Sequence, residues 1–426
     1  MTNNQNQPRE FDAVLGGETP PPTGGAVLGG VKGVKQRLAS NVAEARVAAL
    51  SEALNYGDAG LDLVINALQD VDRQVQRSAY LLLRDKAEAK VKQAIKEYKT
   101  WNFSERLHWE HLYRHTDGCL SQFANRKVEE FDPEKGLTET TGVAYALRCV
   151  LHGESGEELK QQFEMLIQHP KAKEVEALVF GLWTDWLTED ESSRIVVDLL
   201  INAKEKLENL QALFIGDIQE HEWMISYIEQ CDLSPILAAY PKLEVLQVRG
   251  GKGLEFTKLQ HNNLKALIIE AGVLYRRTIA QLCALNLPEL EHLEFWLGSG
   301  LYGADSRIDD LAPILSGNLF PNLTYLGLRN SEISDNIAKA LVNSSIINYL
   351  QVLDLSMGTL GDEGAEALLN CSAVKQLDIL NVYENYLSDK VIIKLSQLPI
   401  QVLADQQKYY KDHHYLNKHR YCSISE

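Results

Sequence analysis

One short pattern of apolar residues occurs seven times between residues 175 and 355. It consists of an apolar residue, two others, a leucine, one other and a second apolar residue, and its copies are Val175/Leu178/Phe180, Leu210/Leu213/Ile215, Leu243/Leu246/Val248, Leu264/Leu267/Ile269, Leu290/Leu293/Phe295, Leu323/Leu326/Leu328 and Leu350/Leu353/Leu355. An eighth, weaker copy follows at Val374/Leu377/Ile379. Each copy is typical of a short strand with one buried side, because side chains alternate along a strand. Such a strand cannot bury its apolar residues alone, so the copies must stack.

The spacing of the copies indicates what separates the strands. The middle leucines are 35, 33, 21, 26, 33, 27 and 24 residues apart, and the longer intervals contain insertions such as residues 298–310. Residues 277–285 and 362–369 have a helical pattern. The template therefore resembles the leucine-rich repeat, which implies an α/β solenoid with parallel strands on the concave side and helices on the convex side. The asparagine that normally closes each turn is replaced by Gly251, Ser331 and Gly358, so another backbone pairing must hold those corners.

The repeat region also resembles a particular family. The segments that carry this resemblance are residues 212–218, 246–251, 293–298, 326–335 and 353–365. From about residue 123 to residue 426 the chain is similar to the STM-type bacterial leucine-rich-repeat proteins, which are related to the repeat halves of MolR/WGR-associated proteins. The resemblance implies the fold, and it implies no particular activity.

Residues 34–98 have a different, helical pattern. Apolar residues recur at helical spacing in residues 42–50 and 61–68. In residues 70–83, an aspartate-rich turn precedes valine, arginine and the small residues Ser78 and Ala79, which resembles a HEAT-type helical repeat. Only about two such repeats fit here, whereas three or more usually stand alone. We therefore expect this module to depend on the rest of the chain or on a partner.

The first 31 residues are rich in glycine and proline, and we expect a disordered, flexible tail. The pentapeptide Ala-Val-Leu-Gly-Gly occurs in it twice. The copies are a candidate recognition or processing signal, with the residues Leu15, Gly16, Gly17, Leu28, Gly29 and Gly30. An accident of composition and a strand that docks on the next domain are the alternatives.

These patterns predict four parts. They are a flexible tail at 1–31, a HEAT-like all-α module at 32–100, a connector and solenoid cap at 101–170, and a leucine-rich-repeat domain at 171–426. Within the cap, residues 143–151 read as a strand and residues 157–169 as an amphipathic helix.

Composition limits the compartment and the partners. No apolar run approaches the roughly 20 residues of a membrane helix, and the polar first nine residues lack the apolar core of a signal peptide. The six cysteines are scattered without a CxxC pair, which favours reduced thiols. Residues 1–100 hold 13 basic and 12 acidic residues, which leaves 29 and 47 for the remainder, a net charge of −18. That charge disfavours nucleic acid as a partner, and we expect a cytoplasmic protein without membrane contact.

The sequence contains no strong enzymatic motif. It has no phosphate loop, GxSxG or HExxH, and the glycines at 250–253 are typical of a tight corner after a strand. His108, His111 and His115 share one face of an expected helix, which suits a metal-dependent enzyme or, more simply, a partly buried helix. The histidines at 413, 414 and 419 are typical of a solvated end piece. We expect no cofactor and no enzymatic activity.

The concave face of the predicted solenoid is the sharper candidate site. Residues on either side of the last apolar position of each copy should point to this face. They include Phe214, Gln247, Arg249, Glu270, Glu294, Trp296, Arg329, Asp354 and Asp378. Arginine and tryptophan are favoured anchors of protein interfaces. The alternative is a set of internal ion pairs, Arg249–Glu270 and Arg329–Asp354.

The sequence thus predicts a non-enzymatic scaffold or adaptor. Its concave face would bind a protein partner, and its tail would be bound by another protein. The alternatives are a chain that is the substrate of a partner protease cutting in the tail, and a metal-dependent enzyme with a site at residues 108–115.

Overall fold

The structure is a computed structural model that describes residues 30–70, 72–84, 86–98, 104–107, 120–149, 155–183, 192–408 and 420–424. The chain forms two compact units that divide between residues 98 and 99. Each unit is described by itself.

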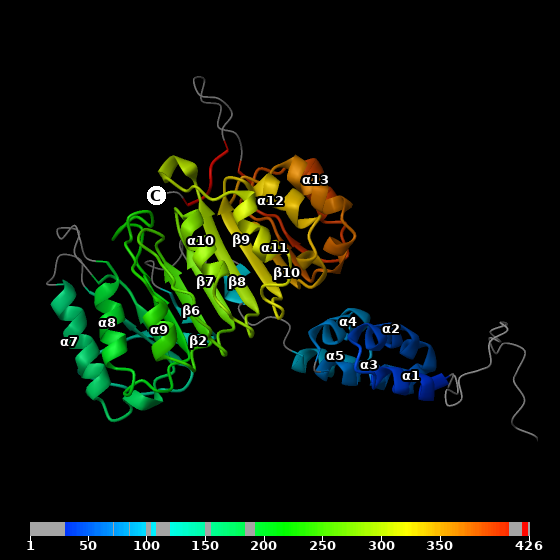
Figure 1. The fold of residues 1–426 in the computed structure, drawn as a ribbon, viewed down its shortest axis with the longest axis horizontal. Coiled ribbons are helices and arrows are strands. Elements are labelled where there is room, and N and C mark those ends of the chain that lie inside the picture. Colours follow the sequence, from blue (N-terminus) through cyan, green and yellow to red (C-terminus); the bar gives the residue numbers. More distant parts are fainter. Residues whose placement is uncertain are drawn as a thin grey trace, which may run out of the picture. The chain divides into compact units, whose positions relative to one another are not determined.

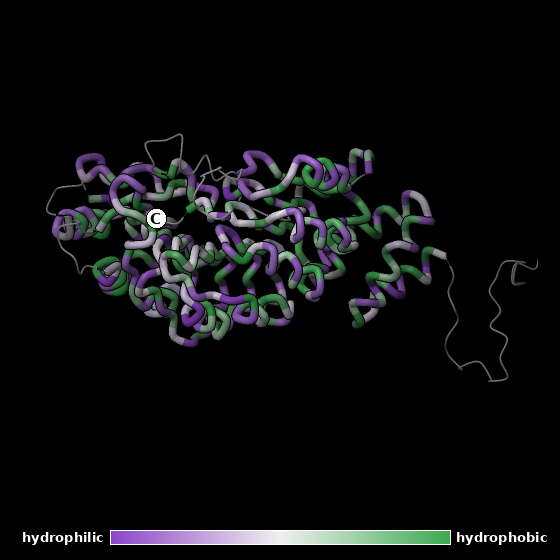
Figure 2. The backbone as a smooth tube through the Cα atoms, turned by 90° about the horizontal axis from the view of Figure 1, so that it is seen from above, coloured by the Kyte–Doolittle hydropathy of each residue, from purple (hydrophilic) through white to green (hydrophobic). Residues whose placement is uncertain are grey.

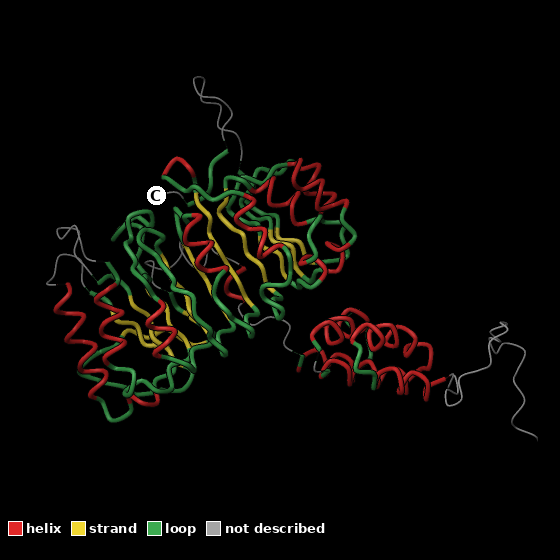
Figure 3. The backbone as a smooth tube through the Cα atoms, viewed as in Figure 1, coloured by secondary structure: helices red, strands yellow, loops and turns green. Residues whose placement is uncertain are grey.

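The first unit consists of helices, as its sequence predicts (Figure 3). They are α1 (Gly30–Leu38), α2 (Ala43–Ala53), α3 (Gly57–Asn66), α4 (Arg73–Leu83) and α5 (Ala89–Glu97), with 3-10 turns at Leu54–Tyr56 and Ala67–Gln69. Val34, Leu50 and Val64 are fully buried in its core. The first helix begins at Gly30, and residues 1–29 lie outside the described part of the chain.

The second unit is built on one curved sheet whose twelve strands, counted over the described residues, follow the order of the sequence. They are β1 (Gln122–Phe123), β2 (Arg126–Glu130), β3 (Val143–Leu147), β4 (Ala177–Phe180), β5 (Ala212–Ile215), β6 (Val245–Arg249), β7 (Ala266–Glu270), β8 (His292–Gly298), β9 (Tyr325–Ser331), β10 (Val352–Asp354), β11 (Ile379–Asn381) and β12 (Gln401–Leu403). The pair β1–β2 is antiparallel, and the following pairs are parallel. The predicted α/β solenoid is confirmed.

Helices line one side of this sheet, where they cover its convex face (Figure 1). They are α7 (Ser155–Gln168), α8 (Arg194–Asn202), α9 (Ser234–Ala239), α10 (Arg276–Cys283), α11 (Ala312–Leu315), α12 (Ser334–Leu341), α13 (Asp362–Asn370) and α14 (Asp389–Leu395). Between them lie 3-10 turns at Ala172–Glu174, Gly300–Tyr302, Ile308–Leu311, Ile346–Asn348 and Ala373–Gln376. The helices predicted at residues 157–169, 277–285 and 362–369 are α7, α10 and α13.

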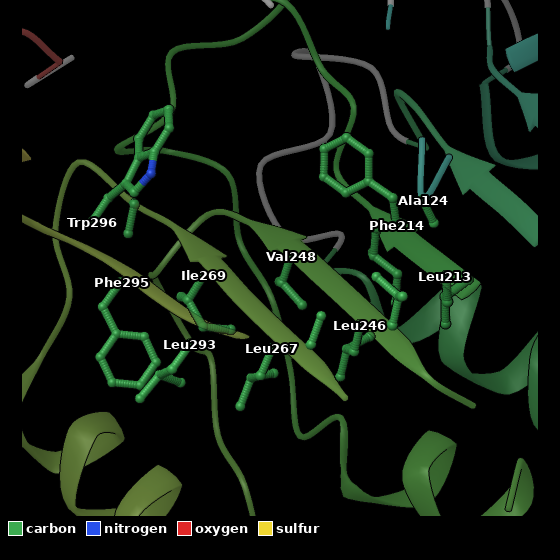
Figure 4. Packing of buried hydrophobic residues seen from close by; sticks show 14 of the residues in the cluster. Ala124, Leu213, Phe214, Leu246, Val248, Leu267, Ile269, Leu293, Phe295 and Trp296 are labelled. Atoms are coloured by element: carbon green, nitrogen blue, oxygen red, sulfur yellow. The ribbon is translucent and has the colours of Figure 1, made fainter. Parts of the chain in front are cut away.

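The middle leucines of the first seven copies form the core row of the solenoid. Leu178 faces Leu213 across the ladder, and the row continues through Leu246, Leu267, Leu293, Leu326 and Leu353. These leucines are at most 1% exposed. Figure 4 shows four of them side by side beneath the strands, with Phe214 and Trp296 on the opposite side.

The eighth copy is shifted from its predicted position. Leu353 pairs with Leu380, not with Leu377, so the copy is Leu377/Leu380/Val382. This triplet fits the same template. Its middle leucine, Leu380, lies 27 residues after Leu353, which in turn lies 27 residues after Leu326. The ninth strand of the row, β12, was not predicted, because Pro399 stands where the template requires its first apolar residue.

The corners are held by two kinds of side chain. Asn385 accepts a hydrogen bond from the backbone N–H of Leu360 at 2.9 Å and donates to the carbonyl of Leu355 at 2.9 Å, so the shifted eighth copy has the usual asparagine. At the preceding corner, the Ser334 hydroxyl donates to the carbonyl of Ser331 at 2.7 Å and accepts from the N–H of Thr359 at 3.1 Å. The glycine corner is confirmed at Gly250, whose φ of +106° disfavours other residues.

Within the described residues, no helix is long and apolar enough to span a membrane. Figure 2 shows the hydrophobic segments as short stretches with hydrophilic residues between them.

Candidate functional site

The predicted binding residues gather on the inner face of the sheet, which we define as the face opposite the helices. Two adjacent columns run across strands β5–β10, because the parallel register sets Arg249 beside Glu270 and Trp296 beside Arg329. Eight of the nine predicted residues lie there, and each is at most 3% exposed. These side chains point to the concave face as predicted, but other parts of the second unit cover them, so they are not exposed to solvent. Whether they bind a partner stays a prediction.

Asp378 is the ninth predicted residue, and it does not lie in the columns. Its assignment followed from the wrong register of the eighth copy. In the observed register Asn381 stands beside Asp354, and its side-chain amide donates to the Asp354 carboxylate at 2.9 Å. Asp378 lies three residues earlier and is partly exposed.

The alternative of internal ion pairs is confirmed in its geometry. The Arg249 guanidinium lies 2.9 Å from the carboxylate of Glu270, and that of Arg329 lies 3.6 Å from Asp354. Arg329 also pairs with Glu294 at 2.9 Å. These pairs join β6 to β7 and β8 through β9 to β10, and Arg106 connects the two sets into one buried network of charges.

Glu294 is the centre of this network. Its carboxylate accepts a hydrogen bond from the indole N–H of Trp296 at 2.7 Å and is paired with Arg329 and with Arg106. Burial alone would raise the pKa of Glu294, but the two guanidinium groups hold it well below its ordinary value. The pKa of Glu270 is likewise lowered against the effect of burial, by Arg249 and Arg106. Both groups are therefore fixed as carboxylates.

A third column of the inner face was missed by the sequence reasoning. His292 and Tyr325 lie two residues before Glu294 and Gly327, and their rings stack at 3.8 Å. The Tyr325 hydroxyl donates to Asp354 at 3.0 Å. Burial lowers the pKa of His292, while burial and then the nearby carboxylates raise that of Tyr325. The residue directly before the middle leucine of each copy also points to the inner face, so including that position would have predicted this column.

Residues near the first strands of the sheet extend the network beyond Arg249. Arg148 pairs with the buried carboxylate of Asp217 and donates to its carbonyl at 2.8 Å. Arg249 lies 3.8 Å from the same carboxylate. Phe123 of β1 packs against Phe214 with ring centroids 5.9 Å apart. Residues of the predicted cap thus cover part of the inner face.

Arg106 also covers the inner face, and the sequence reasoning missed it as well. It belongs to η3 (Ser104–Leu107), a 3-10 turn well before the repeats, and is 3% exposed. Its guanidinium lies 2.7 Å from Glu270 and 2.6 Å from Glu294. No local pattern marks it, because its partners are 164 and 188 residues away in the sequence.

Several predicted features lie outside the described residues. They are His108, His111 and His115, the histidines at 413, 414 and 419, and the tail residues Leu15, Gly16, Gly17, Leu28 and Gly29. Over the residues that are described, no group of three or more histidine, cysteine or acidic side chains is placed to hold a metal. Five of the six cysteines are described, and each is a free thiol.

Comparison with known proteins identifies the family. The family described as "Leucine Rich repeat" matches residues 347–369. No curated protein matches the chain. Among solved structures, an internalin from Listeria monocytogenes is 17% identical, with a TM-score of 0.33, covering 62% of this chain and 61% of that one.

A structural-genomics target from Bacteroides fragilis is more similar. It is 30% identical to this chain, with a TM-score of 0.58, and the match covers 65% of this chain and 77% of that one. The family match at residues 347–369, which contain β10, and the similarity to the Bacteroides fragilis structure both agree with the observed repeats. The chain therefore belongs to the leucine-rich-repeat proteins.

Proposed function

We propose that this protein is a non-enzymatic scaffold or adaptor whose inner sheet face binds a protein partner. Leucine-rich-repeat folds typically bind proteins, by means of the curved face of the sheet. One observation carries the proposal to this chain. The inner face already holds a peptide segment, η3, by hydrogen bonds to an arginine side chain and to main-chain carbonyls.

The residues proposed for contact with the partner are those of the two columns. They offer Arg249 and Arg329 as fixed donors, Glu270, Glu294 and Asp354 as fixed acceptors, and Trp296 as an aromatic anchor. Such a set recognises polar peptide groups at defined positions rather than one continuous apolar surface. We propose in addition that the protein acts in the cytoplasm and belongs to the STM-type proteins within its family.

Affinity capture with matched variants tests this function. Trp296→Phe removes the indole donor to Glu294 but keeps a buried aromatic ring, and Leu301→Ser changes a side chain that is 74% exposed in the 3-10 turn Gly300–Tyr302. We expect a partner, identified by mass spectrometry from a lysate of the source cells, to bind the wild type and Leu301→Ser and to be lost with Trp296→Phe. Equal capture by all three proteins would place the binding site elsewhere and contradict the proposal. Circular dichroism checks that the variants fold.

The repeated pentapeptide favours a second role, in which the tail is recognised or cut by a partner protease. Two identical Leu-Gly-Gly segments end at Gly17 and Gly30, and Gly30 is the first residue of α1. Cleavage there would give new N-termini at Glu18 or Val31. Incubation with a lysate and mass spectrometry of the N-terminus detects either product. A tail that stays intact, and that captures nothing as an isolated peptide, would contradict this role.

A further inference from the structure

Arg106 and Leu107 lie across the inner face in the manner of a bound peptide. The Arg106 side chain contacts β7 through Glu270 and β8 through Glu294. Leu107 is 7% exposed and packs with Tyr325 of β9 and Val352 of β10. This dipeptide therefore meets side chains from four successive strands.

The guanidinium of Arg106 is recognised from two directions. Its Nε and Nη2 donate to the two oxygens of Glu294 at 3.2 Å and 2.6 Å, a forked pair that fits arginine and not lysine. Nη2 also donates to Glu270 at 2.7 Å. These acceptors are thus arranged for a planar, doubly donating cation.

The main chain of the dipeptide is recognised as well. Arg329 donates from Nη1 to the carbonyl of Arg106 at 3.2 Å, and the Asn381 amide donates to the carbonyl of Leu107 at 3.4 Å. Hydrogen bonds to main-chain carbonyls bind any peptide backbone and do not select a particular sequence. Together with the arginine pocket and the apolar site for Leu107, they define a groove for an arginine followed by an aliphatic residue.

The charges of the groove require such an arginine. The buried carboxylates of the described network are Asp217, Glu270, Glu294 and Asp354. The sheet region supplies the guanidinium groups of Arg148, Arg249 and Arg329 to pair with them. Arg106 supplies the fourth positive charge from outside the repeats. Among the described residues, a groove emptied of Arg106 would hold four buried carboxylates against three guanidinium groups, and a buried charge is costly without a cation.

We propose that Arg106 and Leu107 are an intramolecular ligand of the inner face, and that the partner displaces them with its own arginine–aliphatic segment. This inference rests on the proposed function, because it names the chemistry of the partner for the same site. A tethered ligand acts at an effective concentration on the order of millimolar. The free protein would therefore bind a short partner peptide weakly, and a partner would bind well once η3 is withdrawn.

A peptide-binding measurement tests this proposal on the full chain. The probe is a fluorescent peptide with the sequence of residues 103–110, and fluorescence anisotropy gives its affinity. We expect Arg106→Ala/Leu107→Ala protein to bind the probe at least about tenfold more tightly than the wild type, because its groove is free. Probes that carry Arg106→Ala or Arg106→Lys should bind at least about tenfold more weakly to this variant. Equal affinity for the two proteins, or for the three probes, would overturn the proposal.

A second measurement applies if the double variant is too unstable for anisotropy. In differential scanning fluorimetry, we expect the unlabelled probe to raise the Tm of the double variant and to leave the Tm of the wild type unchanged. A variant that the probe does not restore would show that η3 is only a structural cover. If that occurs while the captured partner still depends on Trp296, the proposed function stands and only the intramolecular ligand is refuted. Probe binding without any captured partner would support the groove and refute the proposed scaffold function.

Discussion

Arg329 shows how much of the inner face depends on single buried charges. It is fully buried, pairs with Glu294 and Asp354, and lies 5.4 Å from the centre of the Trp296 ring. Removing it leaves two carboxylates in an interior that does not solvate them. A buried charge that loses its partner typically costs about 3–5 kcal/mol.

We therefore expect Arg329→Met to lower the free energy of unfolding of the second unit by about 3–5 kcal/mol, as measured by urea denaturation. The control is Lys339→Met, which breaks the exposed pair between Lys339 and Glu363 at 2.7 Å. Exposed pairs contribute at most about 1 kcal/mol. A similar loss in both variants would show that the inner network adds no more than a surface pair.

We expect His292 to make the stability of the repeats depend on pH. Burial lowers its pKa in the folded protein below the ordinary value of 6.5. The unfolded chain therefore takes up a proton as the pH falls below about 6.5, which favours unfolding. Glu294 and Glu270, whose pKa values are also lowered, add to this loss below about pH 4.5.

Thermal unfolding between pH 5 and 7.5 measures this dependence. We expect the Tm of the wild type to fall toward pH 5, and that of His292→Asn to fall less steeply, because asparagine takes up no proton. His221→Asn, at an exposed position, should keep the wild-type profile. Parallel profiles for the wild type and His292→Asn would contradict a role for His292.

At the scale of elements, the sequence predicts well what depends on local repetition. Seven strands follow from the template, because each places Leu178 or its equivalent in one core row. The predicted position of the eighth strand was wrong because Leu377 and Leu380 both fit the middle position of the template. Only the pairing with Leu353 decides between them. Burial of the inner face was missed because Arg106 reaches it across more than 160 residues. Local patterns hold no information on such contacts.

Asn385 tests the shifted eighth repeat. Its side chain is fully buried and hydrogen-bonds the backbone of Leu360 and Leu355, so Asn385→Ala leaves two buried backbone groups without these partners. We expect a loss of about 1–3 kcal/mol in the free energy of unfolding. Asn343→Ala, which removes an exposed side-chain hydrogen bond at a helix end, should cost less than about 1 kcal/mol. Equal losses would indicate that Asn385 does not hold the corner.

At the scale of the whole solenoid, residues 420–424 fasten strands that are far away in sequence. Asn330 exchanges two hydrogen bonds with the backbone of Ile424, at 3.0 Å and 2.6 Å, and the N–H of Ser423 donates to the carbonyl of Met357 at 2.8 Å. Arg420 pairs with Asp335 at 2.7 Å. Solenoid stability is a sum of contacts between neighbouring repeats, so damage at one place spreads little.

Deletion of residues 420–426 should therefore loosen only part of the sheet. We expect faster hydrogen exchange in β9–β11, which lie beside the lost contacts, and unchanged exchange in β3–β6, because the contacts named above go to residues 330–357. Mass spectrometry of exchange by peptide distinguishes the two regions. Arg420→Ala, which removes the ion pair but keeps the three backbone contacts, should give a smaller effect in the same strands. Uniformly faster exchange from β3 to β12 would instead mean that the repeats unfold as one cooperative block, and that nearest-neighbour contacts do not account for their stability.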